Sequence, residues 1–323
     1  MLRLLIALTV AALAAGGTAH ADTYPQRPVR FILNFGPGSG VDITARLIAD
    51  KLSTKWGKPV VVENRAGGDG LVAINAFTSA NDDHTLLFVP ASVYTAHPYT
   101  KEKVPYDQER DLLPIVNVTV IVVALVSPVA LGVSSLKEFV ALARAKPNTL
   151  NVAAAAGNSE LIMAAFIKKE NLPIAKVPYR DIMQAPNDLS ENRIQLLMSS
   201  YASMRPLIEA GKLKVLAVTS RKRVGIAPDI PTVAEAGFPF LGIDSLISIY
   251  GPRSMSASAR DSVAADVRAV VEADPSIAKR LAATGQVVDI RGPAEVAAGV
   301  KEMRDQLADI AKTLGIQAVK PTP

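Results

Sequence analysis

The sequence contains no cysteine and only three histidines among its 323 residues. Without cysteine, the chain has no disulfide bond, no thiolate metal ligand and no thiol nucleophile. The histidines, His20, His84 and His97, belong to no catalytic motif. Because a zinc site needs clustered ligands and a catalytic serine needs a histidine base, the sequence predicts no catalytic residue and no metal site.

Aromatic residues are also scarce, at 5% of the chain, and the basic residues are scattered along it. Nucleic-acid-binding surfaces combine clustered Lys and Arg with interleaved aromatics, so the sequence predicts no nucleic-acid partner. The formal net charge of +5 at pH 7 favours small anionic molecules instead, although a solvated basic surface explains it equally well. A hydrophobic content of 49% is typical of a globular protein.

Long hydrophobic runs are missing too, and the run nearest the N-terminus is too short to span a bilayer. It covers residues 4–15, follows Arg3 and precedes a small-residue pattern at residues 19–21. A short positive start, an apolar segment and a small-x-small site are typical of a cleaved secretion signal. The sequence therefore predicts a signal peptide over residues 1–21, with an uncleaved membrane anchor as the alternative.

What the sequence does contain is a regular alternation of strand-like and helix-like segments. Apolar, β-branched runs predict strands at residues 29–35, 59–64, 85–90, 150–156, 175–179, 194–200 and 213–220. Amphipathic segments predict helices at residues 41–56, 70–80, 135–146, 159–171, 185–192, 204–212, 259–273, 276–285 and 293–315. This order is typical of parallel sheets covered by helices on both faces, so the predicted fold class is α/β.

The alternation divides into two α/β units, which we expect at residues 23–126 and 127–245. We assign the helical tail, residues 246–323, to the first unit. Two apolar runs, at 115–127 and 243–252, are long enough to cross between the units. Two lobes joined by two strands form a hinge, and the cleft between such lobes is where ligands bind.

One glycine-rich stretch, NFGPGSGVDITARL at residues 34–47, leads from a predicted strand into a predicted helix. It is not a Walker A loop, because the required Gly-Lys-Ser/Thr ending is replaced by Gly40, Val41 and Asp42. It is not a dinucleotide fingerprint, because its glycines alternate with other residues. It is not a nucleophile elbow either, because Pro37 occupies a required glycine position.

The same stretch predicts a helix N-terminus that small residues leave open to a ligand. Backbone N–H groups of Gly38, Ser39 and Gly40 would face an anion such as a carboxylate, which the helix dipole favours. A tight turn in which Ser39 or Asp42 caps the helix explains the same residues. The stretch by itself leaves both interpretations open.

Further motifs occur in a fixed order along the chain. They are YPQRPVRFILNFGPGSGVDITARLIADKL, PVVVENRAGGDG, VPYDQERDLLPI, VPYRD, IEAGKLKVLAVTSRKR and PDIPTVAEAGFP. Together they resemble the Bug family, the periplasmic substrate-binding proteins of tripartite tricarboxylate transporters. The resemblance extends from Tyr24 to the last predicted helix. It implies a two-lobed periplasmic-binding-protein (Venus flytrap) fold in which two crossover strands form the hinge.

The resemblance also implies a function without chemistry. Receptors of this family close over a small organic carboxylate and deliver it to the permease subunits of the transporter in the membrane. We therefore expect a periplasmic, monomeric protein that is not an enzyme and uses no cofactor. A ligand sensor that docks on a membrane sensor kinase fits the same sequence, whereas a hydrolase on this scaffold lacks the residues that it would need.

The family's ligand-binding loops correspond to five short segments of this chain. The residues that the resemblance assigns to ligand binding are Gly38, Ser39, Gly40, Val41, Asp42, Pro90, Ala91, Ser92, Ala155, Gly157, Asn158, Ser159, Tyr179, Arg180, Asp181, Ser199 and Ser200. In the family such loops hold the ligand mainly through backbone N–H groups, hydroxyls and bridging waters. The same segments are therefore expected to surround a carboxylate here.

Several positions depart from the family pattern. Val41 replaces a threonine, Asp181 stands where glycine is common, and Glu160 lies near a position that histidine usually holds. The two acidic groups would oppose a plain polycarboxylate. The departures predict a ligand with one carboxylate and a cationic or neutral polar part, or a small monocarboxylate, unless Arg180 offsets the charge or these groups form a solvated rim.

Overall fold

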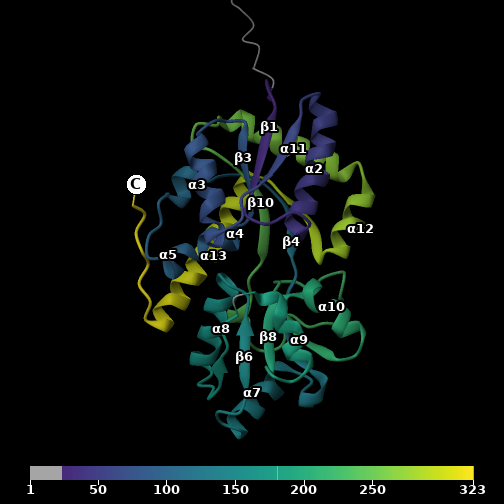
Figure 1. The fold of residues 1–323 in the computed structure, drawn as a ribbon, viewed down its shortest axis with the longest axis vertical. Helices are drawn as coiled ribbons and strands as arrows, with labels where there is room; N and C mark the ends of the chain where they lie inside the picture. The colour runs from purple at the N-terminus through teal and green to yellow at the C-terminus, as the bar shows by residue number, and fades with distance from the viewer. Residues whose placement is uncertain (1–23, 180, 323) are drawn as a thin grey trace, which may run out of the picture.

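The computed structural model describes residues 24–179 and 181–322. The predicted signal peptide over residues 1–21 and the predicted site residue Arg180 therefore lie outside the described residues. The described chain forms two β-sheets with helices around them, stacked along the longest axis of the molecule (Figure 1). We call the half with the six-stranded sheet lobe 1 and the half with the five-stranded sheet lobe 2.

The sheet of lobe 1 has the strand order β11-β4-β10-β3-β1-β2. Its strands are β1 (Val29–Leu33), β2 (Val60–Asn64), β3 (Thr85–Pro90), β4 (Leu113–Ile121), β10 (Ser245–Gly251) and β11 (Gln286–Arg291). Successive side chains of β1 point to opposite faces, as strand geometry requires. Phe31 and Leu33 join one buried core, and Ile32 joins another, so both faces of the sheet are covered.

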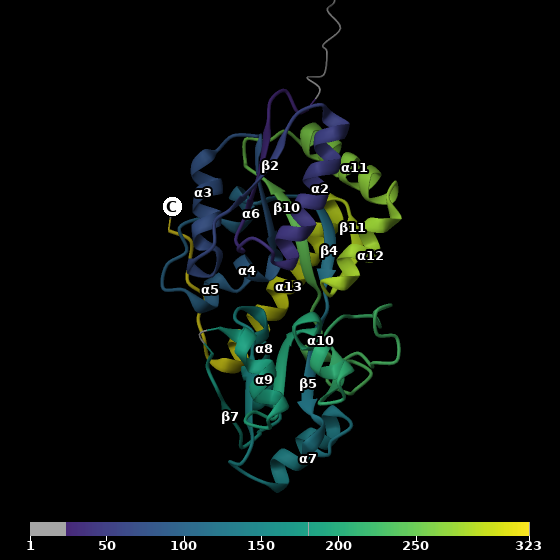
Figure 2. The same cartoon turned by 45° about the vertical axis from the view of Figure 1, so that its right-hand side comes forward.

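Helices pack on both faces of this sheet (Figure 2). One face carries α2 (Gly40–Trp56), α11 (Ala257–Glu272) and α12 (Pro275–Ala283). The other carries α3 (Leu71–Ala80), α4 (Ala91–Thr95) and α13 (Pro293–Leu314). The short helices α5 (His97–Thr100) and α6 (Gln108–Asp111) complete the connection from α4 to β4, and the 3-10 turn η1 (Gly68–Gly70) precedes α3.

The sheet of lobe 2 has the order β7-β6-β8-β5-β9. Its strands are β5 (Val123–Pro128), β6 (Asn151–Ala154), β7 (Ala175–Lys176), β8 (Leu196–Ser200) and β9 (Leu213–Val218). Its helices are α7 (Leu136–Ala145), α8 (Asn158–Lys169), α9 (Ala185–Ser190) and α10 (Tyr201–Glu209), with 3-10 turns η2 (Val129–Leu131), η3 (Ile182–Gln184) and η4 (Pro239–Leu241).

The chain passes between the lobes at two crossovers. β4 is followed, after Val122, by β5, and residues 243–244 lead from lobe 2 back into β10. The N–H of Val122 donates to the carbonyl of Gly285 in lobe 1, and its carbonyl accepts from the N–H of Tyr201 in lobe 2. Val122 is thus bonded to both lobes at the point where the chain leaves one sheet for the other.

Strand directions determine which strand ends lie between the lobes. β4 runs toward lobe 2 and β10 runs antiparallel to it, so β3 and β1 also run toward lobe 2. β5 runs away from lobe 1, so its antiparallel neighbour β8 and the parallel strand β6 run toward lobe 1. The carboxyl ends of β1, β3, β6 and β8 therefore meet at one boundary, which we call the interlobe edge.

The expectation of parallel sheets is wrong in part, because both sheets are mixed. β10 pairs antiparallel with β3 and β4, β11 with β4, and β5 with β8 and β9. A strand that enters a lobe from the other lobe points away from the interlobe edge, whereas the strands beside it point toward that edge. The crossover strands β5 and β10 are therefore antiparallel to their neighbours.

The C-terminal helix α13 connects the lobes a third time, which the sequence did not indicate. It contacts β4 in lobe 1 and α8 in lobe 2. Its buried residues Met303, Leu307 and Ile310 share one core with Ile162 and Phe166 of α8. No helix within the described residues, α13 included, combines the length and the apolar character that crossing a bilayer requires.

Candidate functional site

Four helices begin at the interlobe edge, because each follows a strand that ends there. They begin at Gly40 (α2), Ala91 (α4), Asn158 (α8) and Tyr201 (α10). The N-terminus of a helix presents backbone N–H groups and the positive end of the helix dipole. The fold thus brings together loops of both lobes that the sequence analysis assigned to ligand binding.

The lobes touch each other at this edge. A Cβ atom on Gly157 would lie 3.4 Å from the carbonyl oxygen of Ser92. The side chain of Asn158, which is 3% exposed, bonds through both its amide atoms to the Thr95 hydroxyl, at 3.2 and 3.3 Å. Asn158, a predicted ligand-binding residue, therefore makes a buried polar contact between lobe 2 and lobe 1.

The loop before α2 is held by the carboxylate of Asp42, which is 2% exposed. This carboxylate accepts the N–H of Gly38 at 2.9 Å, the Nε of Arg46 at 3.0 Å and the Nδ2 of Asn64 at 2.8 Å. Asn64 also donates to the carbonyl of Phe35. Asn64 was not among the predicted site residues, although its place at the end of a predicted strand was a usable signal.

Burial opposes ionisation of Asp42, but the hydrogen bonds from Arg46, Asn64 and Gly38 outweigh it and hold the pKa of the carboxyl below its ordinary value. Asp42 is therefore a charged, fully partnered scaffold for the loop. At 2% exposure, Asp42 positions the loop backbone and presents almost no carboxylate surface.

The N–H groups of this loop are partly used already. The N–H of Gly38 donates to Asp42 and the N–H of Ser39 to the carbonyl of Gly36, so the expectation that both offer free N–H groups is wrong. The Ser39 hydroxyl accepts the N–H of Asp42 at 3.2 Å and caps α2. In an α-helix the first N–H groups have no acceptor within the helix, which leaves those of Gly40 and Val41 as the donors of this turn.

Gln286, the first residue of β11, fixes the start of α2 from behind. It is 2% exposed; its Nε2 donates to the carbonyl of Gly40 at 2.8 Å, and its Oε1 accepts the hydroxyls of Thr44 and Thr119. A Cβ atom on the preceding Gly285 would clash with Ala202 of lobe 2. The sequence analysis identified neither Gly285 nor Gln286, because it predicted no strand at β11 and no sequence motif connects β11 with α2.

On the lobe 2 side, a pocket of about 250 Å³ opens beside the start of α8. It is lined by Ala154, Ala156, Glu160, Lys176, Val177, Pro178, Tyr179, Asp181 and Ile182. The Oε1 atom of Glu160 lies 2.6 Å from the Nζ atom of Lys176. The pocket therefore joins apolar walls to one ion pair and one further carboxylate.

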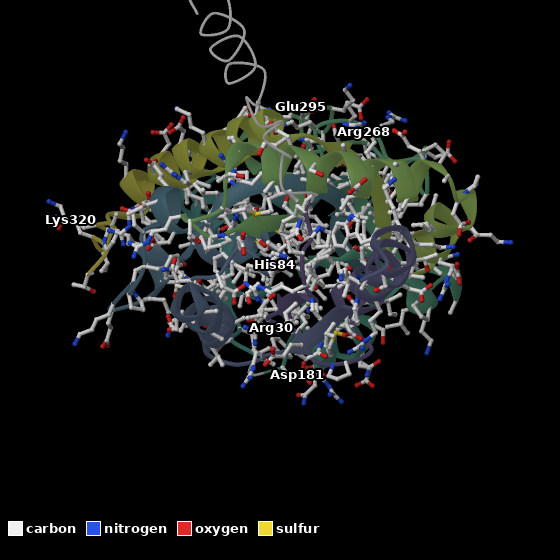
Figure 3. The ribbon with its side chains drawn as sticks, turned by 90° about the horizontal axis from the view of Figure 1, so that it is seen from above. Arg30, His84, Asp181, Arg268, Glu295 and Lys320 are labelled. Atoms are coloured by element: carbon white, nitrogen blue, oxygen red, sulfur yellow. The ribbon has the colours of Figure 1, made fainter. Side chains whose placement is uncertain are left out.

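Tyr179 and Asp181 line this pocket, but their polar side-chain atoms form hydrogen bonds with other residues of lobe 2. Burial, followed by the hydrogen bond to Asp188, raises the pKa of the Tyr179 hydroxyl to about 12, and the hydroxyl donates to Asp188 at 2.7 Å. Asp181 accepts the N–H of Met183 and caps η3. Figure 3 shows Asp181 at the side of the molecule opposite Arg268 and Glu295.

The remaining predicted residues lie on the same edge with different exposure. Pro90, Ala91 and Ser199 are buried at strand ends or helix starts, while Ser92, Ala155, Ser159 and Ser200 are half-buried. The N–H of Ala155 is taken by the carbonyl of Met198. Apart from Arg180, which is not described, the structure brings every predicted residue to the interlobe edge or to the adjoining lobe 2 pocket.

The two described histidines have structural partners, as expected. His84 is 5% exposed, and its Nε2 accepts the backbone N–H of Gln26 at 3.0 Å. His97 is buried between the hydroxyl of Tyr106 and the carbonyl of Asp69, and burial lowers its pKa. Neither ring lies in the lobe 2 pocket.

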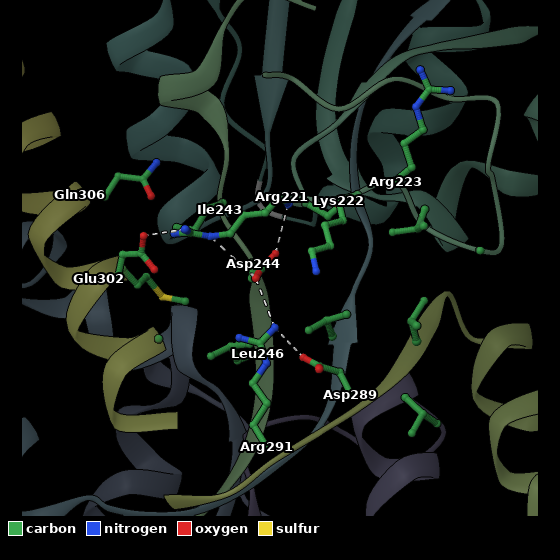
Figure 4. A pocket seen from close by; sticks show the side chains of 18 residues that line it. Arg221, Lys222, Arg223, Ile243, Asp244, Leu246, Asp289, Arg291, Glu302 and Gln306 are labelled. Carbon is green, nitrogen blue, oxygen red and sulfur yellow. Dashed lines mark hydrogen bonds and ion pairs between the residues drawn. The ribbon is translucent and has the colours of Figure 1, made fainter. Parts of the chain in front are cut away.

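A larger cavity, of about 410 Å³, lies beside the crossovers and is drawn in Figure 4; we call it the hinge-side pocket. Most of its charged groups are held in ion pairs, while Arg223 pairs with Glu235 outside the pocket and no partner of the Lys222 ammonium is seen within the described residues. Arg221 binds Glu302 of α13 at 2.5 Å, and Arg291 binds Asp289 at 2.7 Å and Asp244 at 3.4 Å. None of the predicted ligand-binding residues that the structure describes lines this pocket.

Two mixed α/β lobes, joined by crossover strands and with helix N-termini meeting between them, define the class of periplasmic solute-binding proteins. The chain belongs to the tripartite tricarboxylate transporter receptor family, whose sequence model matches residues 44–302. The resemblance to Bug proteins and the predicted two-lobed fold are thereby confirmed.

Relatives in sequence and structure agree with this assignment. Protein BugT of Bordetella pertussis is 31% identical over 259 residues, which cover 78% of this chain and 79% of that protein. Among solved structures, the periplasmic binding protein BugD is 26% identical with a TM-score of 0.71, covering 91% of this chain and 99% of that one. R. palustris Rpa4515, solved with adipate, is 26% identical with a TM-score of 0.77, covering 92% of this chain and 100% of that one.

Proposed function

We propose that this protein is a periplasmic receptor that captures a small organic carboxylate between its lobes and presents it to the membrane subunits of a tripartite tricarboxylate transporter. One observation carries the proposal: the starts of α2, α8 and α10 converge at the interlobe edge in a chain of this receptor family. Capture and release need binding and no chemistry, in keeping with histidines that are held by structural partners.

In this proposal the carboxylate binds to backbone donors at the start of α2, and lobe 2 closes over the rest of the ligand. The contact residues lie within 38–42, 90–92, 155–159, 179–181 and 199–200. Asp42 and Gln286 support them by fixing the backbone on either side of Gly40. The adipate bound to Rpa4515 supports a carboxylate as the ligand class.

The moving parts in this proposal are lobe 1 and lobe 2, with the first boundary at Val122 and not at the expected residue 126, because β5 (Val123–Pro128) belongs to the sheet of lobe 2. The bonding of Val122 to both lobes supports a hinge at the first crossover. The second crossover at residues 243–244 supplies the other hinge strand. The contact of α13 with α8 restricts closure to motions that keep these two helices packed.

A thermal-shift screen tests the ligand class directly. The purified protein, stripped of bound ligand by partial unfolding and dialysis, is heated with mono-, di- and tricarboxylates and with amino acids. A ligand at about 100 times its Kd stabilises the native state by about 2.7 kcal/mol, which raises Tm by several degrees. A cooperative melt that no carboxylate shifts would contradict the proposal.

Delivery is tested separately by binding to membranes. Detergent extracts that contain the permease subunits should retain the protein when ligand is present and release it when ligand is absent, because the permease reads the closed form. Retention by a sensor kinase and not by the permease would assign the receptor to signalling instead of transport.

A further inference from the structure

The charged side chains of the lobe 2 pocket indicate which kind of ligand the receptor selects. This inference rests on the function proposed above. Among the described lining residues the charged groups are Glu160, Asp181 and Lys176, two carboxylates and one ammonium. The ammonium is already bound to Glu160 at 2.6 Å. An entering carboxylate would therefore meet a paired cation and an additional negative charge.

The position of Glu160 strengthens this effect. Glu160 lies in the first turn of α8, where the helix dipole favours a negative group. In many anion sites this place is left to the ligand. Here the carboxylate of Glu160 occupies the first turn of α8. A second carboxylate on the ligand would therefore compete with Glu160 both for the helix N-terminus and for Lys176.

Among the described lining residues, the other polar groups do not compensate for this charge. The Tyr179 hydroxyl stays protonated but donates to Asp188, away from a ligand. Asp181 uses one carboxylate oxygen to cap η3, and it adds a second acidic side chain to the pocket wall. The remaining walls, Ala154, Ala156, Val177, Pro178 and Ile182, are apolar and suit a methylene chain.

We infer that Glu160 and Lys176 are the specificity-determining pair of this receptor. They select a ligand with one carboxylate, an apolar middle and a cationic far end, such as an ω-amino acid, over a dicarboxylate of the same length. The single carboxylate binds at the start of α2, and the far end enters the lobe 2 pocket, where the carboxylates of Glu160 and Asp181 accept its hydrogen bonds.

The test uses ligands that differ only in the far end. Three series serve: succinate, 4-aminobutanoate and butanoate; glutarate, 5-aminopentanoate and pentanoate; adipate, 6-aminohexanoate and hexanoate. Affinities are measured by isothermal titration calorimetry. At the chain length that binds, we expect the wild-type protein to bind the amino acid at least about tenfold more tightly than the dicarboxylate, as opposite and like charges at close range require.

Two variants shift the preference in opposite directions: Glu160→Gln toward the dicarboxylate and Lys176→Met further toward the amino acid. Glu160→Gln should strengthen dicarboxylate binding and weaken amino-acid binding, each about fivefold, and leave the monocarboxylate within twofold. Lys176→Met should do the opposite, because it leaves Glu160 uncompensated. Both side chains are partly exposed, at 44% and 34%, so neither substitution removes a buried group and both variants are expected to fold.

A matched control removes one carboxylate far from the pocket. Glu272 is paired with Arg268 on α11 of lobe 1, and Figure 3 shows Arg268 on the side opposite Asp181. Glu272→Gln should leave all affinities within twofold. A shift of the same size in this variant would mean that net protein charge, and not the pocket, sets the preference.

The outcomes separate this inference from the proposed function. If dicarboxylates bind best and Glu160→Gln changes all members of a series alike, the pair does not determine specificity, while the receptor function stands. If other carboxylates bind but no amino-acid member does, the inference is also overturned. If no small carboxylate binds at all, the proposed function itself fails.

Discussion

The interlobe edge and the hinge-side pocket both lie near the crossovers, but their charged side chains have different roles. In the hinge-side pocket, Arg221 and Arg291 are neutralised by Glu302, Asp244 and Asp289. At the start of α2, the charged group is buried and holds the backbone, so that N–H groups remain for a ligand. The difference shows that a large and highly charged cavity is not by that fact the better candidate site, because Arg221, Arg291 and the three carboxylates near them are already paired.

The largest effect is expected at the interlobe edge, from Asp42→Ala. The substitution removes the acceptor for Gly38, Asn64 and Arg46, and it leaves a cavity in the loop. Because the Arg46 side chain is half exposed and solvent screens its charge, we expect a loss of about 2–3 kcal/mol in the free energy of unfolding, below the roughly 3–5 kcal/mol for breaking a fully buried pair. Urea denaturation measures the loss.

The control for this prediction is Asp50→Ala, in the same helix but exposed, which should change stability by less than about 0.5 kcal/mol. The pH dependence adds a second readout. The pKa of Asp42 is depressed in the folded state, so its stabilisation is present above about pH 4 and is lost as pH falls through the lower folded pKa. Between these values the wild type should lose stability more steeply than Asp42→Ala. Equal slopes would contradict the assigned role.

A smaller effect is expected for the contact between the lobes at Asn158. Asn158→Ala and Thr95→Ala each remove one partner of a buried hydrogen bond, at a cost of about 1–2 kcal/mol. In the double variant the effects should not add, and a coupling of about 1 kcal/mol is expected from denaturation midpoints. Thr100→Ala serves as control, because its hydroxyl bonds only within its own segment, to Ala96. Strict additivity of Asn158 and Thr95 would mean that the contact is not formed in solution.

The smallest effect is expected in the hinge-side pocket. The Arg221–Glu302 pair is exposed on both sides, at 50% and 56%, and such pairs contribute about 0.2–1 kcal/mol. Arg221→Ala and Glu302→Ala should therefore change stability slightly, and less so at high salt. Ligand affinity should stay within twofold. A loss of affinity as large as that from Asp42→Ala would abolish the distinction between the two regions.

Much of the fold follows from local patterns. The apolar runs and amphipathic segments predicted nearly all longer elements within a few residues, because a strand or helix that buries one face must carry a matching period. β11 was missed, since its residues alternate too weakly to stand out. The antiparallel pairing of β5 and β10 could not be predicted from the local sequence. The direction of a strand depends on the lobe from which the chain enters the sheet.

The sequence by itself determined the two-lobed α/β class, the family and the set of loops at the interlobe edge. Motif order and hydrophobic period are properties of the chain that need no distant partner. Only the tertiary structure decided that Asp42 is a buried scaffold, that Gln286 fixes Gly40 from β11, and that Glu160 is paired with Lys176. A side chain's charge and free hydrogen-bonding capacity depend on partners that lie 242 residues away, as between Thr44 and Gln286, as readily as on neighbours in the chain.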